Sequence, residues 1–458
     1  MKAIMRDERE MKDSRIEWIG KIPASWNIER MKNQFVYTKG LNITKADLVD
    51  EGVAVISYGQ IHAKNNTGTT LNPEFLRYIS PDNIAINDKS LLNMGDIVFA
   101  DTSEDYDGLG NAVYMDSDTE TYAGYHTIIA RLKNIDYSKY FAYLFKSDAW
   151  REQLRIRASG IKVFSVTQRM LNDVTLIMPG KNAIRPIISY LDDRCSKIDT
   201  IIAEAKASIE EYQELKQAVI YEAVTKGINH TQCKHIDIDY LDDMPVNWHI
   251  SSIGLLFQFI GGYAYKSDRF IVDSNFQVIR IGNVKDNNLV LERNPVFISA
   301  EYATESNNAQ IQVDDILFTM TGTKGKGDYF YTLIIKENDL VNKKLFVNQR
   351  VGCFRKSNSN IYMAYYNYLL KMPKIREYVF LFETGTANQG NIGIEVLNRI
   401  KLYCPPYDEQ VKIVDYLDNK TERIDNLISE KQSLIEDLES YKKSLIYEVV
   451  TGKRKVVA

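Results

Sequence analysis

The sequence is poor in cysteine and lacks a long apolar run. Its four cysteines, Cys195, Cys233, Cys353 and Cys404, are scattered, without a C-x-x-C pair or a neighbouring histidine cluster. This pattern argues against a disulfide framework and a zinc site, and it fits a reducing compartment. The charged N-terminus has no apolar signal-peptide core, and no later stretch is long and apolar enough to cross a bilayer. We therefore expect a cytoplasmic protein.

A basic excess is also missing. The formal net charge of -4 gives no general support for nucleic-acid binding, because domains that bind nucleic acid usually carry a basic excess or a basic face. The 458 residues, 45% of them hydrophobic and 26% charged, suggest two to four domains that each bury a core.

The chain contains an internal duplication. Such a repeat determines the fold class, because each copy is expected to form the same structural unit. Residues 187–226 and 413–452 align without a gap, each residue lying 226 positions from its copy. Shorter matches continue upstream, so the order is domain, helix, domain, helix. The matching strings are Tyr190–Asp192 with Tyr416–Asp418, Val224–Thr225 with Val450–Thr451, Pro23–Trp26 with Pro245–Trp248, and Gly95–Phe99 with Asp314–Phe318.

The duplicated segments have the residue spacing of coiled-coil helices, with seam positions alternately four and three residues apart. No proline follows Pro186 within them, and Gly227 and Gly452 stand where helix stops are expected. The polar seam residues Lys216, Lys431 and Lys442 are typical of a register device or of a solvated edge of the seam. The two seams are Leu191, Cys195, Ile198, Ile202, Ala205, Ile209, Tyr212, Lys216, Val219, Ala223 and Leu417, Thr421, Ile424, Ile428, Lys431, Ile435, Leu438, Lys442, Leu445, Val449.

Two matching seams favour pairing of the helices with each other. At about 1.5 Å per residue, some forty residues form a rod of roughly 60 Å, which exceeds the ~34–36 Å of one DNA turn and could hold two modules at separate stations along a duplex. A plain antiparallel hairpin or a dimer zipper explains the periodicity equally well.

The blocks between the helices, residues 14–180 and 235–406, are rich in short β-type runs separated by Gly, Asn and Asp turns. Examples are Val53–Ile56 and Gln277–Ile281. Each block is expected to form a mixed α/β or mainly β domain.

Catalytic motifs are incomplete. The loop Thr321–Gly327 offers amides and two ammonium groups to phosphate, but Asp328 stands where a Walker loop needs lysine; a plain turn is the alternative. Cys404-Pro-Pro-Tyr407 departs from the amino-methyltransferase motif, because cysteine accepts hydrogen bonds poorly from a flipped base. No glycine-rich turn for S-adenosylmethionine is present, and no partner stands near His62 or His126 at a catalytic spacing. We expect no catalytic, metal or cofactor residues in this chain.

Residues suited to DNA recognition lie on the predicted loops of both blocks. Amides and guanidinium groups suit base edges, whereas lysines and hydroxyls suit phosphates. Each residue alone fits a solvated surface, so the prediction rests on the set. The candidates are Lys39, Lys45, Tyr58, Gln60, His62, Lys64, His126, Arg157 and Lys162 in the first block, and Tyr263, Tyr265, Lys266, Arg280, Asn283, Thr321, Thr323, Lys324, Lys326, Asn348, Gln349, Arg350, Asn388 and Gln389 in the second.

The order of motifs along nearly the whole chain resembles the type I restriction-modification specificity subunits. One departure is that Ala183-Ile184, followed by Arg185-Pro186, replaces Glu409-Gln410, which weakens the predicted helix start there. The motifs are Trp18–Trp26, Gly95–Ala100, Ala123–Thr127, Val278–Asn283, Asp315–Thr323, Asn348–Val351, Pro405–Gln410 and Tyr416–Asp418.

The resemblance implies an α+β fold in which two mixed α/β target-recognition domains, in pseudo-two-fold repeat, are separated by two long helices that form an antiparallel coiled coil. The implied boundaries are 1–182 for the first domain with an N-terminal extension, 183–230 for the central spacer helix, 231–406 for the second domain, and 407–458 for the C-terminal spacer helix and basic tail.

The resemblance further implies a non-catalytic, cofactor-free subunit. Each domain would read one half of an interrupted, asymmetric DNA site, and the helices would set the gap. Two methyltransferase subunits, which bind the S-adenosylmethionine, would modify adenine N6, and a motor-nuclease subunit would join for cleavage. The alternatives are a self-contained DNA adenine methyltransferase or nuclease with degenerate motifs, and a coiled-coil scaffold that binds protein only.

Overall fold

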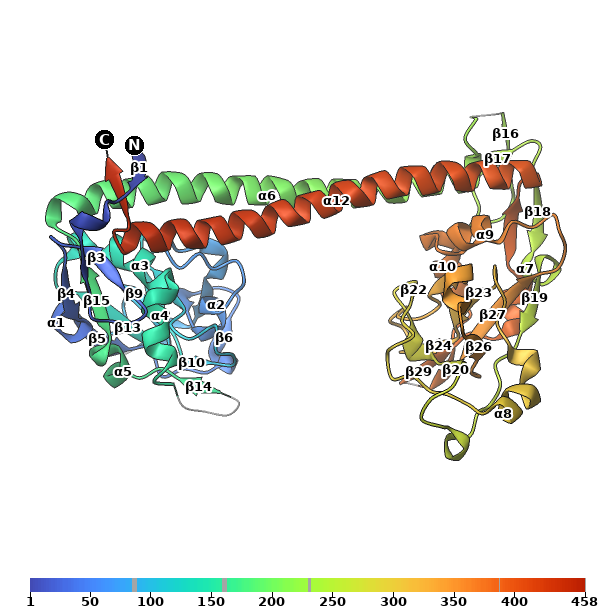
Figure 1. Ribbon diagram of the computed structural model, residues 1–458, viewed down its shortest axis with the longest axis horizontal. Coiled ribbons are helices and arrows are strands. Elements are labelled where there is room, and N and C mark those ends of the chain that lie inside the picture. Colours follow the sequence, from blue (N-terminus) through green and yellow to red (C-terminus); the bar gives the residue numbers. More distant parts are fainter. Residues whose placement is uncertain (85–88, 159–162, 230–231, 387, 458) are drawn as a thin grey trace. The chain divides into compact units, whose positions relative to one another are not determined.

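A computed structural model describes residues 1–84, 89–158, 163–229, 232–386 and 388–457 (Figure 1). These residues form two compact units, each described by itself. Unit 1 contains Met1–Ala207 and Lys431–Ala458, and unit 2 contains Ser208–Glu430. Unit 2 is thus one continuous segment, whereas unit 1 is assembled from both ends of the chain.

Unit 1 is built around an antiparallel four-stranded sheet in the order β11-β9-β13-β5. Its central strand β9 is buried at every position, as its apolar run predicts. A second sheet has the order β12-β7-β8-β6, in which β12 and β7 are parallel. The strands of these two sheets are β5 (Phe35–Lys39), β6 (Leu48–Val49), β7 (Val53–Ile56), β8 (Arg77–Ile79), β9 (Ile97–Ala100), β11 (Ala112–Tyr114), β12 (Thr121–Ala123) and β13 (Thr127–Leu132).

Short helices and two-stranded ribbons complete unit 1. The strand β4 pairs with β15, and β10 pairs with β14. These elements are β2 (Met11–Asp13), β3 (Lys21–Pro23), β4 (Asn27–Arg30), α1 (Met31–Gln34), α2 (Tyr58–Ile61), β10 (Thr102–Ser103), α3 (Ser138–Lys146), α4 (Asp148–Arg155), β14 (Phe164–Ser165), α5 (Gln168–Asp173) and β15 (Thr175–Met178).

Unit 2 repeats this topology. Its main sheet has the order β19-β27-β23-β25, a parallel pair joins β20 to β26, and β18 pairs with β30 as β4 does with β15. Its elements are β16 (Cys233–Lys234), β17 (Met244–Pro245), β18 (His249–Ser252), α7 (Ile253–Leu256), β19 (Phe257–Ile260), β20 (Phe276–Ile279), β21 (Val284–Lys285), β22 (Asn288–Leu289), α8 (Ala300–Glu305), β23 (Ile316–Thr319), β24 (Thr321–Gly322), β25 (Thr332–Ile334), β26 (Lys344–Val347), β27 (Val351–Lys356), α9 (Met363–Leu370), α10 (Pro373–Phe380), β28 (Thr384–Thr386), β29 (Gln389–Asn391), α11 (Ile394–Arg399) and β30 (Lys401–Cys404). The predicted fold class, with two similar mixed domains and long helices, is confirmed.

The helices α6 (Lys181–Lys226) and α12 (Tyr407–Val450) each begin in one unit and end in the other. In unit 1 the Nζ of Lys442 donates to Asp199 at 2.6 Å, and in unit 2 that of Lys216 donates to Asp425 at 2.7 Å. The two ion pairs are copies of each other in the duplication. In each pair the two residue numbers add up to the same value, as expected when one helix runs antiparallel to the other in a single register. Two of the predicted polar seam residues thus join the helices and favour this register.

The C-terminal ends of the two long helices lie where the sequence predicts them, whereas the start of α6 differs from the prediction. Gly227 and Gly452 follow the helices with φ of +74° and +72°, a conformation that a side chain would strain. The departure at Pro186 was expected to weaken the start of α6, yet the helix begins at Lys181 and includes Pro186. Pro186 lacks the N–H for one helical hydrogen bond. The neighbouring Ile184 and Ile187 are buried in the core of unit 1 and stabilise this turn.

The predicted basic tail is a strand. β31 (Arg454–Val457) pairs antiparallel with β1 (Lys2–Met5), so the two ends of the chain lie side by side in unit 1 (Figure 1). Arg6 also donates to the carbonyl oxygen of Gly452 at 2.9 Å. Among the described residues, no helix has both the length and the apolar content that a bilayer crossing requires.

Candidate nucleic-acid interface

A buried ion pair holds the central strand of each main sheet. In unit 2 the guanidinium of Arg355 donates to both oxygens of Asp315, at 2.9 and 2.6 Å, and the N–H of Gln312 donates to the same carboxylate at 2.7 Å. In unit 1 Arg131 donates to Asp96 at 2.8 Å in the same way. The acidic residue of the repeated Asp-Ile-hydrophobic-Phe motif is therefore structural. It fixes the turn before β9 or β23, and the far end of β23 leads to the candidate Thr321.

Two glycines bring a loop against the end of each main sheet. A Cβ on Gly40 would lie 2.0 Å from the carbonyl oxygen of Gly124, and a Cβ on Gly262 would lie 2.1 Å from that of Asn348. Only glycine permits this close approach. The loops that precede β13 and β27 are thereby held beside the ends of β5 and β19.

An aromatic cluster occupies this position in unit 1. The ring of Tyr58 lies 5.6 Å from those of Tyr125 and His126 and 6.3 Å from that of His62, measured between ring centres. His126 is exposed, and its Nδ1 lies 3.1 Å from Oδ1 of Asp101. Three predicted residues thus come together. Tyr125 was missed, although it adjoins His126 in a motif that was recognised.

His62 lines a cavity of about 520 Å³ beside this cluster. Its Nε2–H donates to the carbonyl oxygen of Thr102 at 2.7 Å, and its Nδ1 lies 3.1 Å from the amide nitrogen of Asn111. The carbonyl can only accept, so Nε2 carries a proton, and both ring nitrogens are occupied. The carboxylates that line the cavity are Glu104, Asp105 and Asp107. Carboxylates accept hydrogen bonds from the cytosine amino group, and the sequence-based candidates did not include them.

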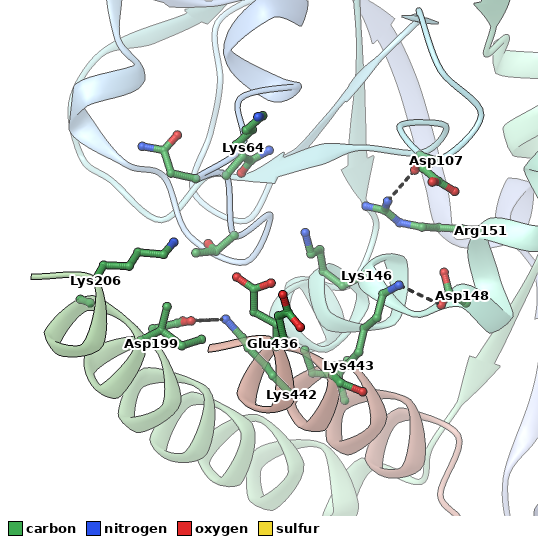
Figure 2. Close-up of a pocket in the computed structure, with 18 of the residues that line it drawn as sticks. Lys64, Asp107, Lys146, Asp148, Arg151, Asp199, Lys206, Glu436, Lys442 and Lys443 are labelled. Carbon is green, nitrogen blue, oxygen red and sulfur yellow. Dashed lines mark hydrogen bonds and ion pairs between the residues drawn. The ribbon is translucent and has the colours of Figure 1, made fainter. Parts of the chain in front are cut away.

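The other candidates of unit 1 are dispersed. Lys39 and Lys45 are exposed at the end of β5 and in the next loop. The side-chain oxygen of Gln60 accepts from the N–H of Ser57 at 3.1 Å and caps α2, and Arg157 donates to the carbonyl oxygen of Gln153. Lys64 lines a different cavity (Figure 2). Lys162 lies outside the described residues.

The candidates of unit 2 are more concentrated. Thr321, Gln349, Arg350 and Gln389 line one cavity of about 410 Å³. A small sheet in the order β24-β29-β28 frames it, and the N–H of Met320 donates to the carbonyl oxygen of Arg350 at 3.1 Å. Gln349 and Arg350 are exposed, so their amide and guanidinium groups could meet base edges. The cavity also contains Thr386 and Asn391, which the sequence-based prediction missed although they flank Asn388 and Gln389.

Aromatic residues lie next to this cavity. The N–H of Tyr263 donates to the carbonyl oxygen of Val347 at 2.9 Å, which places Tyr263 beside Asn348. Tyr265 packs against Tyr263 and Tyr302 at 5.0 and 5.3 Å between ring centres. Burial raises the pKa of Tyr265 to about 12, so this phenol stays neutral. Tyr265 is a packing residue, whereas Lys266 is exposed.

Asn283 is buried and fully engaged within unit 2. Its side-chain oxygen accepts from the N–H of Arg280, and its amide nitrogen donates to the carbonyl oxygens of Val290 and Arg293, each at 2.9 Å. Asn283 therefore orders the following loop and does not reach solvent. Arg280 donates to the carbonyl oxygen of Asn294 at 2.6 Å.

The glycine-rich loop has the contacts of a folded turn. The N–H of Thr323 donates to Asp328 at 2.7 Å, and the N–H of Gly325 donates to Glu383 at 2.9 Å. Carboxylates thus occupy two of the amides that were considered for phosphate. Lys324 donates to the carbonyl oxygen of Gly385 at 3.1 Å, whereas the side chain of Lys326 is exposed.

Comparisons with known proteins agree with this architecture. Residues 245–437 match the family model described as the type I restriction modification DNA specificity domain. A comparison with curated protein sequences found no match. A chain from a solved structure described as "Structural basis underlying complex assembly and conformational transition of the type I R-M system" is 15% identical with a TM-score of 0.69, and the alignment covers 94% of this chain and 99% of the other.

The HsdS subunit from Thermoanaerobacter tengcongensis is 16% identical with a TM-score of 0.53, and the alignment covers 94% of this chain and 98% of the other. At these identities the likeness shows a shared fold that extends over nearly the whole chain. The family model adds the kind of domain that this fold carries. The match to the type I restriction modification DNA specificity domain thus covers residues 245–437, within a fold that is shared with these structures over nearly the whole chain.

Proposed function

We propose that this chain reads a bipartite, asymmetric DNA site, with unit 1 recognising one half and unit 2 the other. The observation that carries the proposal is a duplicated framework whose exposed side chains differ. The loop before β13 presents His126, whereas the equivalent loop before β27 presents Arg350. The hydrogen-bonding groups of imidazole and guanidinium select different base edges. Two domains with the same framework and different exposed side chains support the recognition of two different DNA half-sites.

In this proposal the chain supplies specificity and no chemistry of its own. Two methyltransferase subunits assemble on it and bind the S-adenosylmethionine, a motor-nuclease subunit joins for cleavage, and the complex acts in the cytoplasm. The structural neighbour with a TM-score of 0.69 is described in terms of complex assembly of a type I system, which supports partner binding. The paired helices α6 and α12 are proposed to set the gap between the half-sites.

The test of this function is a genome-wide map of methylated adenines with and without the gene for this chain. Deletion is expected to abolish methylation at one interrupted motif, and the wild-type gene supplied in trans is expected to restore it. A map in which no interrupted motif disappears would contradict the proposal. Methyl transfer by the purified chain alone would instead support the self-contained enzyme.

Arg350 offers a sharper prediction at one base pair. We expect Arg350→Ala to cost about 1–3 kcal/mol of discrimination at one position of a single half-site, because an arginine can donate two hydrogen bonds to guanine. The measurement is duplex binding by the assembled complex to a library of singly substituted sites.

The matched control is Lys326→Ala in the neighbouring glycine-rich loop. Loss of a phosphate contact lowers affinity for all sequences alike and reduces the salt dependence by about one ion. If Arg350→Ala also lowered the affinity for all DNA sequences alike, Arg350 would contact the DNA backbone and not a base.

A further inference from the structure

The helices α3 and α9 share a pattern, Tyr-x-x-Tyr-Leu-x-Lys, at equivalent positions of the two units. Its tyrosines attach each domain to the long helices. In unit 1 the hydroxyl of Tyr140 donates to the carbonyl oxygen of Val450 at 2.9 Å, and that of Tyr143 donates to Asp192 at 2.6 Å. The copies in unit 2 are Tyr365 to Val224 at 2.8 Å and Tyr368 to Asp418 at 2.6 Å. The two tyrosines of the pattern therefore have a structural role in both units. In the described part of the chain, the lysine of the pattern has no such contact with the long helices.

In unit 1 that lysine, Lys146, points into a cavity of about 1080 Å³ between the recognition domain and the long helices (Figure 2). Its stem lies against Gly68, where a Cβ would come within 2.8 Å of Cδ. Among the residues that the structure describes, its ammonium has no hydrogen-bond or ion-pair partner. Within that part of the chain, Lys146 is thus a largely buried amine with no direct hydrogen-bond or ion-pair partner, and the carboxylate of Asp199 acts on it only at longer range.

The cations around Lys146 already have partners of their own. The nearby cations Lys442 and Lys443 pair with Asp199 at 2.6 Å and Asp148 at 3.5 Å, and Arg151 donates to the carbonyl oxygens of Phe145 and Asp107. Burial, followed by repulsion from Arg151, Lys442 and Lys443, lowers the pKa of Lys146 to about 7. An ammonium in this position gains free energy when an anion enters the cavity.

Lys371 repeats the arrangement in unit 2. Burial, followed by repulsion from Lys216 and Lys336, lowers the pKa of Lys371 to about 8, and Lys216 is engaged with Asp425. Over the described ranges, both copies therefore keep an unpaired lysine beside an interhelical ion pair, although the exposed side chains near the sheet ends have diverged. A feature present in both units suits one kind of partner that binds twice.

The surroundings of Lys146 favour a protein carboxylate over a DNA phosphate. Glu436 and Glu439 of α12 line the same cavity and would repel a polyanion. A single carboxylate on a partner surface avoids most of this repulsion, and cations beside it could meet the two glutamates. Carboxylate–ammonium pairs at such sites are strong when solvent is excluded.

We propose that Lys146 and Lys371 each receive a carboxylate side chain from one methyltransferase subunit, one subunit for each unit of this chain. The inference rests on the proposed function, which supplies the partner. It assigns the contact to two residues that DNA recognition does not use.

The experiment compares Lys146→Met, Lys371→Met and the double variant, each co-expressed with the methyltransferase subunit. Native mass spectrometry of the full complex is expected to show two partner copies for the wild type, one for each single variant and none for the double variant. Titration should show about a thirtyfold or greater loss of affinity for the affected copy, the effect of removing one member of a buried charge pair. Lys146→Arg keeps the cation and should retain two copies.

The fold should survive these changes, because methionine removes an unpaired buried charge and fills a similar volume; unchanged thermal unfolding of the free chain checks this. Lys206→Met, which removes an exposed lysine lining the same cavity, should keep two copies, and an equal loss there would overturn the inference. Two tightly bound copies in the double variant would also overturn it while leaving DNA specificity intact. A uniform loss of DNA affinity with normal partner binding would assign the lysines to DNA. If the wild-type chain bound no methyltransferase, both the inference and the proposed function would fail.

Discussion

Replacing residues 235–405 with the corresponding segment of another specificity subunit is expected to change one half of the methylated sequence completely while leaving the other half and the gap unchanged. The physical reason is that unit 2 is continuous and buries its own hydrophobic clusters, so its recognition domain can be exchanged without opening unit 1. The long helices, which we propose to set the gap, remain those of this chain. Single-molecule sequencing of methylated adenines measures both half-sites and the gap.

The chain offers its own control for this exchange. Residues 14–180 can replace residues 235–405, and because both domains would then be the same, the methylated site should become a symmetric repeat of one half-site. Residues 14–180 carry their own copy of the Tyr-x-x-Tyr-Leu-x-Lys pattern, and their backbone must still present an N–H to Gln410, which accepts from Tyr362 at 2.8 Å in the native chain. Alteration of both halves, or of neither, would show that the units do not read DNA independently.

Asp315→Ala is expected to destabilise unit 2 by about 3 kcal/mol, because it leaves the guanidinium of Arg355 without its buried counterion. Asp315 is 2% exposed and Arg355 is 22% exposed, so water relieves part of the cost, which places the effect near the lower end of the range for a broken buried pair. The N–H of Gln312 loses its acceptor in the same change. Native-state hydrogen exchange of β23 and β27 measures the loss locally.

The duplication provides the matched variant, Asp96→Ala, which should destabilise unit 1 to a similar extent and leave β23 and β27 protected. Asp315→Asn, which keeps an acceptor oxygen, should cost less than alanine. Equal loss of protection in both units after either alanine substitution would contradict the assignment of one ion pair to each unit.

The long helices were predictable because their signal is local and extends over many turns. The seam residues Leu191, Ile198, Leu417 and Ile424 are all buried, and the two glycine stops lie next to the helix ends. The pairing of β1 with β31 was not predictable, since it joins residues more than 400 positions apart and neither four-residue strand has a distinctive pattern. Many strands have only two to four residues, too few for a periodicity to be measured.

The candidate residues were predictable as chemical types but not as neighbours. Tyr58, His62 and His126 come together because the glycine contact at Gly40 holds a loop that the sequence does not place. Lys64 lies only two residues beyond His62 yet lines another cavity, and Asn283 is buried. The lysines of α3 and α9 were missed although their pattern is present twice, because the intervening residues differ and no insertion-free alignment connects the two segments.

The joining of the two chain ends has a consequence for biosynthesis. The core of unit 1 includes Leu445, Ile446, Val449 and Val450 from the end of α12, whereas unit 2 is complete once residue 430 has been made. A ribosome releases the chain from its N-terminus onward, and domains generally fold as their residues emerge. The domain encoded first is therefore finished last, and an mRNA truncated near its 3′ end would yield a protein whose second half is folded and whose first half still exposes the apolar surface that those four residues cover.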